Sequence, residues 1–304
     1  MKKLICVLIL LLLLTGCSAQ ETVEDGYTFT DDLGREVTVA SYERTAALLG
    51  SYADVWYLAG GTVCASADDA WDDFDLPLED AVNLGGTKDL SLESLLLAKP
   101  DLVLASTNTP QHVQWLDTLE RAGITVAYFD VSEFSDYLRM LKICTDITGS
   151  QEKYVEYGEV LQSQIDEILS RCDGKEPMKV LVMRASAASI RAKNSDGTVL
   201  GTMLRDLGCI NIADSDSSLL ENLSVESILL QDPDKIFFIQ TGDDMQAVEK
   251  NVQSMLRENP LWQELDAVKD GQIYFMDKHL YNLKPNERWA EAYWELEKIL
   301  YEMP

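Results

Sequence analysis

The chain has 304 residues, which is enough for two ordinary domains and a large buried core. Apolar residues make up 46% and charged residues 25%, a composition that is typical of folded proteins and excludes disordered, collagen-like and coiled-coil chains. The 52 acidic and 25 basic residues give a formal charge of −27, and such a surface repels phosphate backbones, so we expect no nucleic-acid partner.

The first residues have the layout of an export signal. Two lysines precede an unbroken apolar run over residues 4–14, which is too short for a permanent membrane-spanning helix. The motif Leu-Thr-Gly-Cys17 follows at once and resembles a bacterial lipobox, in which the cysteine is acylated. We therefore predict a lipoprotein signal peptide over 1–16, lipidation of Cys17, and a tether over 17–26 that anchors an extracytoplasmic protein to the cell membrane. The alternative is an ordinary signal with an incidental cysteine.

Four further cysteines are widely spaced, and no Cys-x-x-Cys occurs, so neither a zinc site nor a redox dithiol is indicated. We expect buried free thiols. One disulfide among them is the alternative, since export permits it. These cysteines are Cys64, Cys144, Cys172 and Cys209.

An internal repeat carries most of the information about the fold. Residues 90–101 and 223–234 agree at eight of twelve positions with a constant offset of 133. Each copy predicts a short helix that begins at a serine, ends at Pro-Asp and leads into an apolar strand. Further downstream, each copy continues with a helix and a strand that ends in aspartate, over 124–130 and 272–277. Apolar strands that alternate with helices predict two similar Rossmann-like α/β lobes with parallel sheets, related by duplication.

The stretch between the two lobes has helical spacing. Apolar residues recur every three or four positions over 150–172, which predicts one stiff helix of roughly 34 Å at about 1.5 Å per residue. We therefore predict an N-terminal lobe over 27–133, a helical segment with this interlobe helix over 134–176, and a C-terminal lobe over 177–304. A single stiff connection also predicts that the lobes close by only a few degrees.

The order and spacing of these parts resemble the substrate-binding lipoproteins of bacterial ABC importers for iron chelates, haem and cobalamin. The resemblance covers residues 27–304. It begins with Phe-Thr-Asp-Asp-Leu-Gly-Arg-Glu-Val over 29–37, which resembles the opening hairpin of that family. The two Leu-Ser-x-Glu-Ser helices resemble its most recognisable segment. The turn over 207–212 is similar to the family's Leu-Gly-Gly turn, with Cys209 in place of the second glycine.

The resemblance implies a protein that captures a metal chelate, foremost a ferric siderophore, between its lobes and delivers it to a permease dimer and its ATPase. Haem or cobalamin is the alternative ligand within the family. A ligand-sensing lipoprotein without a transport role is the alternative of another class. We predict no cofactor and no enzyme, because no hydrolase, zinc-protease or phosphate-loop motif occurs and the chain has only two histidines.

The resemblance also implies that one exposed glutamate of each lobe docks on the permease. By position these are Glu93 and Glu226, which occupy equivalent places in the repeat. Two equivalent carboxylates on two like lobes suit a two-fold permease. The alternative is that each glutamate only favours the positive N-terminus of its own helix.

Ligands of open α/β sheets bind beyond the carboxyl ends of the strands, so we expect the ligand in loops that face each other across a cleft. Basic side chains there suit carboxylates or phosphates, and aromatic ones suit a flat ligand; ordinary surface bases and core aromatics are the alternatives. We expect no metal site of the protein's own, with His279 as a weak candidate for haem ligation. The candidate ligand-binding residues are Tyr52, Trp71, Asn108, Arg184, Arg191, Lys193, Tyr281 and Lys284.

Overall fold

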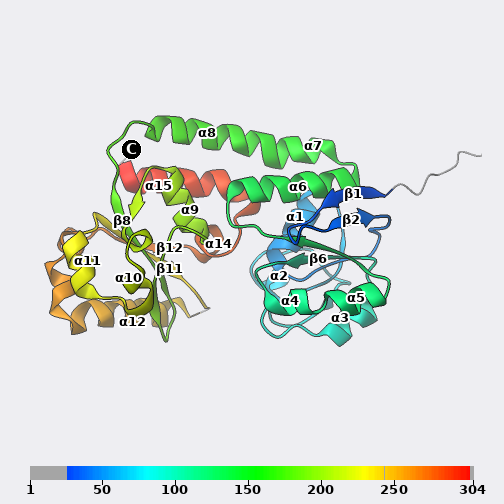
Figure 1. Ribbon diagram of the computed structural model, residues 1–304, viewed down its shortest axis with the longest axis horizontal. Helices are drawn as coiled ribbons and strands as arrows, with labels where there is room; N and C mark the ends of the chain where they lie inside the picture. The colour runs from blue at the N-terminus through cyan, green and yellow to red at the C-terminus, as the bar shows by residue number, and fades with distance from the viewer. Residues whose placement is uncertain (1–25, 243, 302–304) are drawn as a thin grey trace, which may run out of the picture.

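The computed structural model describes residues 26–242 and 244–301. Two α/β lobes lie side by side beneath a layer of long helices, with the N-terminal lobe on the right of Figure 1. The predicted signal peptide and the lipidation site Cys17 lie outside the described residues. Among the residues described, no helix has both the length and the apolar character needed to cross a membrane.

The N-terminal lobe contains a parallel sheet in the order β5-β4-β3-β6-β7, which confirms the predicted sheet type. Every residue of the interior strand β6 is buried, as expected for a strand covered on both faces. An antiparallel hairpin precedes the sheet. The strands are β1 (Tyr27–Thr30), β2 (Glu36–Val39), β3 (Thr45–Ala47), β4 (Val63–Ser66), β5 (Val82–Asn83), β6 (Leu102–Ser106) and β7 (Thr125–Phe129). The helices are α1 (Gly50–Leu58), α2 (Asp69–Asp72), α3 (Leu92–Ala98), α4 (Pro110–Gln114) and α5 (Leu116–Arg121).

Two helices follow the last strand of this lobe. Helix α6 (Phe134–Thr148) ends at Gly149, whose φ of +75° is a left-handed conformation that glycine adopts without strain. The predicted interlobe helix then runs without a break through α7 (Gln151–Tyr154), the π-helical turn η1 (Val155–Glu159) and α8 (Val160–Cys172). The sequence periodicity did not reveal the π turn, because one extra residue in a turn hardly changes the spacing of the buried face.

The C-terminal lobe contains a sheet in the order β10-β8-β11-β12, and these four strands are parallel. The predicted parallel sheet is confirmed, and a fifth strand, β9, which was not predicted, pairs antiparallel with β8 at its edge. The strands are β8 (Lys179–Ala185), β9 (Ile190–Lys193), β10 (Ile210–Asn211), β11 (Lys235–Gln240) and β12 (Ile273–Met276). The helices are α9 (Val199–Asp206), α10 (Ser217–Asn222), α11 (Val225–Gln231), α12 (Met245–Glu258), α13 (Asp266–Lys269), α14 (Lys278–Tyr281) and α15 (Trp289–Tyr301), with 3₁₀ turns η2 (Ile212–Asp214), η3 (Pro260–Glu264) and η4 (Asn286–Arg288).

The long helices join the two lobes. The C-terminal helix α15 packs along α8, where the Arg171 guanidinium binds the buried Glu297 carboxylate at 2.6 and 2.7 Å. One apolar cluster extends from Leu104 of the N-terminal sheet through these helices to Phe237 of the C-terminal sheet. The lobes therefore share a core in addition to the chain connection.

Candidate functional site

Three basic side chains project from one face of the β8–β9 hairpin. Arg184 lies directly opposite Arg191 in the antiparallel register, and Lys193 is two residues further along the same strand. Residues opposite each other, and residues two apart, share a face of a sheet. The same face of the hairpin carries Val182, which is buried in the core shared by the lobes. The three cations therefore lie on the face that packs toward this core, at its edge.

The electrostatics of this group show that the cations lie close together. Burial lowers the pKa of Arg184, and the Arg184 Nε is buried without a hydrogen-bond partner. Burial lowers the pKa of Lys193 as well, and the charges of Arg184 and Arg191 lower it further. Within the described part of the chain none of the three forms an ion pair. Together with Lys284, which is described next, we call these residues the basic cluster.

Lys284 joins this cluster from the loop between α14 and η4. Burial lowers the pKa of its ammonium to about 8, and the charge of Arg184 acts in the same direction. Asp130 and Asp136, which belong to the N-terminal half of the chain, oppose the shift. Lys284 therefore lies between the C-terminal lobe and carboxylates contributed by the other half.

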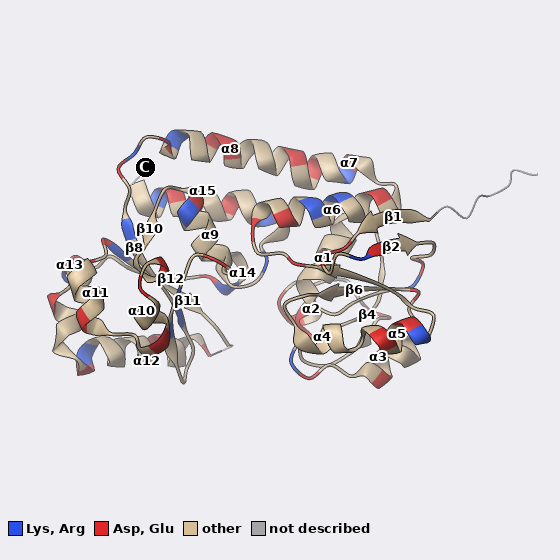
Figure 2. Ribbon diagram, in the orientation of Figure 1, with Lys and Arg blue, Asp and Glu red and all other residues tan. Residues whose placement is uncertain are grey.

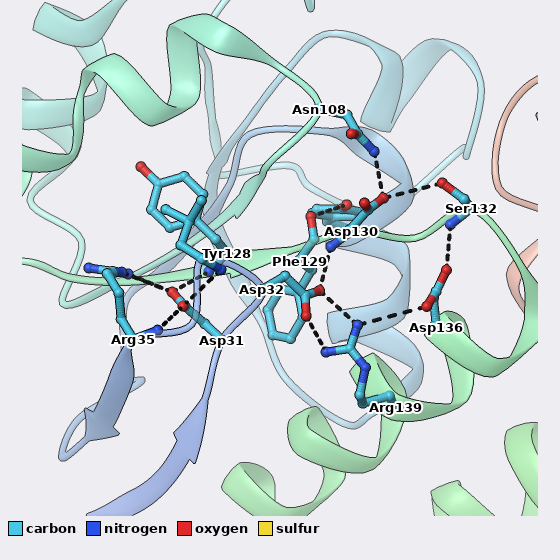
Figure 3. Close-up of polar contacts among 12 residues, drawn as sticks. Asp31, Asp32, Arg35, Asn108, Tyr128, Phe129, Asp130, Ser132, Asp136 and Arg139 are labelled. Atoms are coloured by element: carbon cyan, nitrogen blue, oxygen red, sulfur yellow. Dashed lines mark hydrogen bonds and ion pairs between the residues drawn. The ribbon is translucent and has the colours of Figure 1, made fainter. Parts of the chain in front are cut away.

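The carboxylates belong to a polar network at the end of β7, which Figure 3 shows. Asp130 follows that strand directly and accepts hydrogen bonds from the Asn108 amide at 2.6 Å and the Ser132 hydroxyl at 3.2 Å. Its backbone N–H donates to Asp32, which is held in turn by Arg139 at 2.5 and 2.8 Å. Asn108 is exposed, so its carbonyl oxygen remains open to a ligand.

The N-terminal lobe and the C-terminal lobe are in contact beside this network. The Thr202 hydroxyl of α9 contacts the Ser132 carbonyl at 3.4 Å, and Arg205 lies 3.6 Å from Glu133. A small cavity of about 170 Å³ is lined by residues from both halves, among them Asp54, Asp73 and Lys284. The region next to the basic cluster is thus bounded by both lobes.

The structure corrects two aromatic predictions. Tyr52 was expected in a loop, but it lies inside α1, is 2% exposed, and donates its hydroxyl to the Phe129 carbonyl at 2.9 Å. Tyr281 lies in α14, is 1% exposed, and donates to the Ala292 carbonyl at 3.0 Å. Both rings fill the shared core, because the chain turns into a helix sooner after each strand than the residue pattern indicated.

The third aromatic candidate, Trp71, lies in α2 and is partly buried. Its ring packs on the shared core, and its indole N–H donates to the Leu78 carbonyl at 3.3 Å. Trp71 therefore lies at the edge of the core with part of its side chain exposed, and its role in ligand binding stays a prediction.

His279 is partly exposed at the contact between the halves. Its Nε2 lies 3.6 Å from an oxygen of Asp73 and its Nδ1 lies 3.3 Å from an oxygen of Asp277. No group of three or more side chains in the described residues is suited to hold a metal ion. Carboxylates of the protein thus lie near both ring nitrogens of His279, and the one of Asp277 is within hydrogen-bond distance of Nδ1.

The two repeat glutamates lie on the surface, one in each lobe. Glu93 is in the first turn of α3 and Glu226 is in the first turn of α11, and both are exposed. Each helix begins at a serine whose hydroxyl accepts a hydrogen bond from the third helical N–H, at 3.1 Å in α3 and 3.3 Å in α11. The four cysteines in the described residues are free, and all but Cys64 are buried.

Sequence reasoning missed the network around Asp130. The signal was present, because Asp130 ends a predicted strand and so belongs to the expected ligand edge of the sheet. The participation of Asp32 and Arg139 could not be predicted from the sequence in this way. They are 107 residues apart, and the opening hairpin brings Asp32 to the end of β7 only through tertiary packing.

Comparison with known proteins places the chain among binding proteins. A family model described as "Periplasmic binding protein" matches residues 46–280. The iron-uptake system-binding protein of Bacillus subtilis is 27% identical over 60% of this chain, and the match spans 57% of that protein. The Fe(3+)-citrate-binding protein YfmC of the same organism is 24% identical over 91% of this chain and 90% of its own length. An ABC transporter substrate-binding protein from Listeria monocytogenes superposes with a TM-score of 0.71 at 19% identity, covering 86% of this chain and all of that one.

Proposed function

Because the chain belongs to the periplasmic binding protein family, we propose that it is the extracytoplasmic substrate-binding protein of an ABC importer and captures a ferric chelate that carries carboxylates. The ligand lies between the lobes, against the basic cluster. The protein YfmC, which this chain matches over 90% of that protein's length, is named for binding ferric citrate. Ferric citrate is a chelate of this kind.

The observation that carries the proposal is the basic cluster itself. In a chain of net charge −27, three cations share one face of a hairpin and form no ion pair within the described residues. A fourth, Lys284, lies beside them and is near Asp130 and Asp136. Gathering like charges costs stability, and so does the partial burial of Arg184, Lys193 and Lys284. A ligand with several carboxylates offsets that cost, because guanidinium groups bind carboxylates in a bidentate manner.

The opposite wall suits the other end of such a ligand. Asn108 and Asp130 offer acceptor oxygens to hydroxyl or amide donors. A siderophore surrounds its own iron, so the protein has to supply only shape, charge and hydrogen bonds. Haem is less well matched, since carboxylates of the protein already flank both nitrogens of His279.

Fluorescence titration of residues 18–304 tests the proposal, because the chain has six tryptophans. We expect saturable binding of ferric citrate or another carboxylate siderophore, and weak or no binding of haem and cobalamin. The variant R184Q/R191Q lowers the affinity at least tenfold. The control R121Q/K88Q removes the same charge from exposed sites of the N-terminal lobe and leaves the affinity unchanged. Equal affinities for the two variants contradict the proposed ligand class.

The transport role is tested separately. Glu93 and Glu226 are the proposed docking carboxylates on the permease. We expect E93A/E226A to bind ferric citrate normally and to lose uptake in cells. Unchanged uptake favours a sensor without a transport role. We also propose lipid anchoring at Cys17, which C17A tests, since this variant is expected to release the protein from the membrane.

A further inference from the structure

The two copies of the internal repeat expose one leucine each. Leu97 in α3 is 72% exposed and Leu230 in α11 is 87% exposed, which makes them the most exposed large apolar side chains of the described residues. They occupy equivalent positions, 133 residues apart. One exposed leucine is ordinary on a protein surface. An exposed leucine at the same position of both lobes suggests a role that the two lobes have in common.

The exposed pair belongs to the eight positions of the repeat that are identical, while four of the twelve positions differ. At a buried position, Leu95 of one copy corresponds to Ile228 of the other, and at the helix end the charge reverses from Lys99 to Asp232. The glutamate and the exposed leucine are identical in both copies. Neither side chain is needed for the core, because both point to solvent in each lobe. Core packing therefore does not explain the identity of either residue. The glutamates suit the positive N-termini of their helices, but the leucines have no such role.

In each helix the glutamate and the leucine are four residues apart, which places them on one face about 6 Å apart. Among the described residues Glu93 has no partner, and Glu226 accepts only a hydrogen bond of 3.3 Å from the Ser224 hydroxyl. Each face thus combines one open carboxylate with one apolar side chain. The two helices lie in different lobes, away from the long helices in Figure 1, and each carries a single acidic segment in Figure 2.

We propose that Leu97 and Leu230 are apolar anchors for the permease dimer, an inference that rests on the proposed function. The partner is an integral membrane dimer whose halves each present a hollow of leucine size beside a cation. A two-fold surface recognises like features on two like lobes. The carboxylates steer and register docking, and the leucines add contact area whose removal from water stabilises the complex. Loss of either leucine is therefore expected to weaken docking by a similar factor.

A crosslinking experiment that needs no ligand tests the contact. Cells express the full chain with a photo-reactive benzophenone side chain at position 97, 230 or 160, and adducts are identified by mass spectrometry. Val160 is the matched control, because it is 47% exposed on α8. We expect the same ABC permease polypeptide at positions 97 and 230, and none at 160. Absence of permease adducts at either leucine position overturns the proposal.

Uptake measurements test whether the contact matters. Radioactive ferric citrate is the probe, and L97Q/L230Q is expected to reduce uptake at least tenfold, while V160Q has little effect. Affinity for ferric citrate in the fluorescence titration stays within twofold for each variant. L97M/L230M keeps apolar side chains and is expected to retain uptake. Failure of this variant to transport overturns an apolar role for the two positions.

The outcomes separate this inference from the proposed function. Full uptake by L97Q/L230Q, together with loss of uptake by E93A/E226A, overturns the leucine anchors and leaves the importer role intact. Full uptake by both double variants, or ferric citrate import that does not depend on this protein, contradicts the proposed function. In that case the adducts at positions 97 and 230 still decide whether the leucines contact a permease.

Discussion

Substitution of Lys284 by methionine is expected to stabilise the ligand-free protein and to weaken ligand binding. Burial, with help from Arg184, lowers the pKa of this ammonium from 10.5 to about 8. At about 1.4 kcal/mol per pH unit, the shift corresponds to roughly 3 kcal/mol of lost stability at pH 7. The side chain keeps some solvent contact, so we expect about 2 kcal/mol of this to be measurable.

The sign of the pH dependence follows from proton linkage. The folded state holds the Lys284 proton less tightly than the unfolded chain does, so the unfolded chain binds more protons between pH 8 and 10.5. The penalty is fully present below pH 8, and the wild type gains stability as the pH rises through this window. The advantage of K284M is therefore greatest at pH 7 and shrinks towards pH 10.

Urea denaturation at pH 7 and pH 10 measures the effect. The control is K88M, which removes an exposed lysine from the N-terminal lobe. We expect K284M to unfold at higher urea concentration than the wild type at pH 7, and K88M to match the wild type. We also expect K284M to bind ferric citrate about tenfold more weakly, which is about 1.4 kcal/mol. A K284M variant that is less stable than K88M at pH 7, or whose advantage is equal at both pH values, refutes this reasoning.

Three further substitutions probe contacts around the site. Burial and the nearby Glu287 raise the pKa of Asp54 to about 7, so the folded state loses stability as the pH rises from about 4 to 7. D54N is therefore expected to raise the melting temperature at pH 8 and not at pH 4. R171M leaves the buried Glu297 carboxylate unpaired, and we expect about 2 kcal/mol of lost stability in urea denaturation. Y52F removes one buried hydrogen bond, with an expected loss of about 1 kcal/mol and unchanged affinity for ferric citrate.

Each of these expectations has a contradicting result. Equal changes in melting temperature at both pH values would show that Asp54 does not titrate in the folded protein. The double variant R171M/E297M is the control for the ion pair and is expected to recover most of the stability. If it is as unstable as R171M, packing and not the unpaired charge explains the loss. A large loss of ligand affinity in Y52F would show that the Tyr52 hydroxyl contributes to ligand binding.

Elements with long, regular patterns were predicted well from the sequence. The repeat at an offset of 133 predicted two like lobes, and the helical spacing over 150–172 predicted the interlobe helix, because both patterns repeat over many residues. Arg184 was expected in the loop directly after a strand, but it is the penultimate residue of β8, and Arg191 and Lys193 lie in β9. The strand β9 was missed because four residues of alternating polarity after a short polar turn give a weak signal.

Side-chain placement near the strand ends was less predictable. Tyr52, Tyr281 and Lys284 all follow predicted strands, and the sequence does not distinguish their directions. Tyr52 and Tyr281 have ring hydroxyls that find backbone carbonyls inside the core, whereas the ammonium of Lys284 faces other charges. The difference depends on which face of a short helix or loop packs inward, and that is decided by contacts between segments far apart in the sequence.

The contacts between the lobes argue for limited closure on ligand binding. Asn286 donates its side-chain amide to the Ser51 carbonyl at 2.9 Å and to the Asp54 carboxylate at 2.7 Å. Lys278 lies 2.6 Å from Asp73 of the other lobe. A wide hinge motion would break the buried contacts of Asn286 and the half-buried ion pair of Lys278, and it would split the shared apolar core, whose burial is a main source of stability.

We therefore expect small-angle X-ray scattering of residues 18–304 to give the same radius of gyration, within error, with and without saturating ferric citrate. The control is the variant R184Q/R191Q, which is expected to show no ligand effect at all. A clear compaction of the wild type alone would show that the helical layer bends on binding. The contacts of Asn286 and Lys278 would then be the ones that break and re-form during transport, and the docking faces of α3 and α11 would move relative to each other.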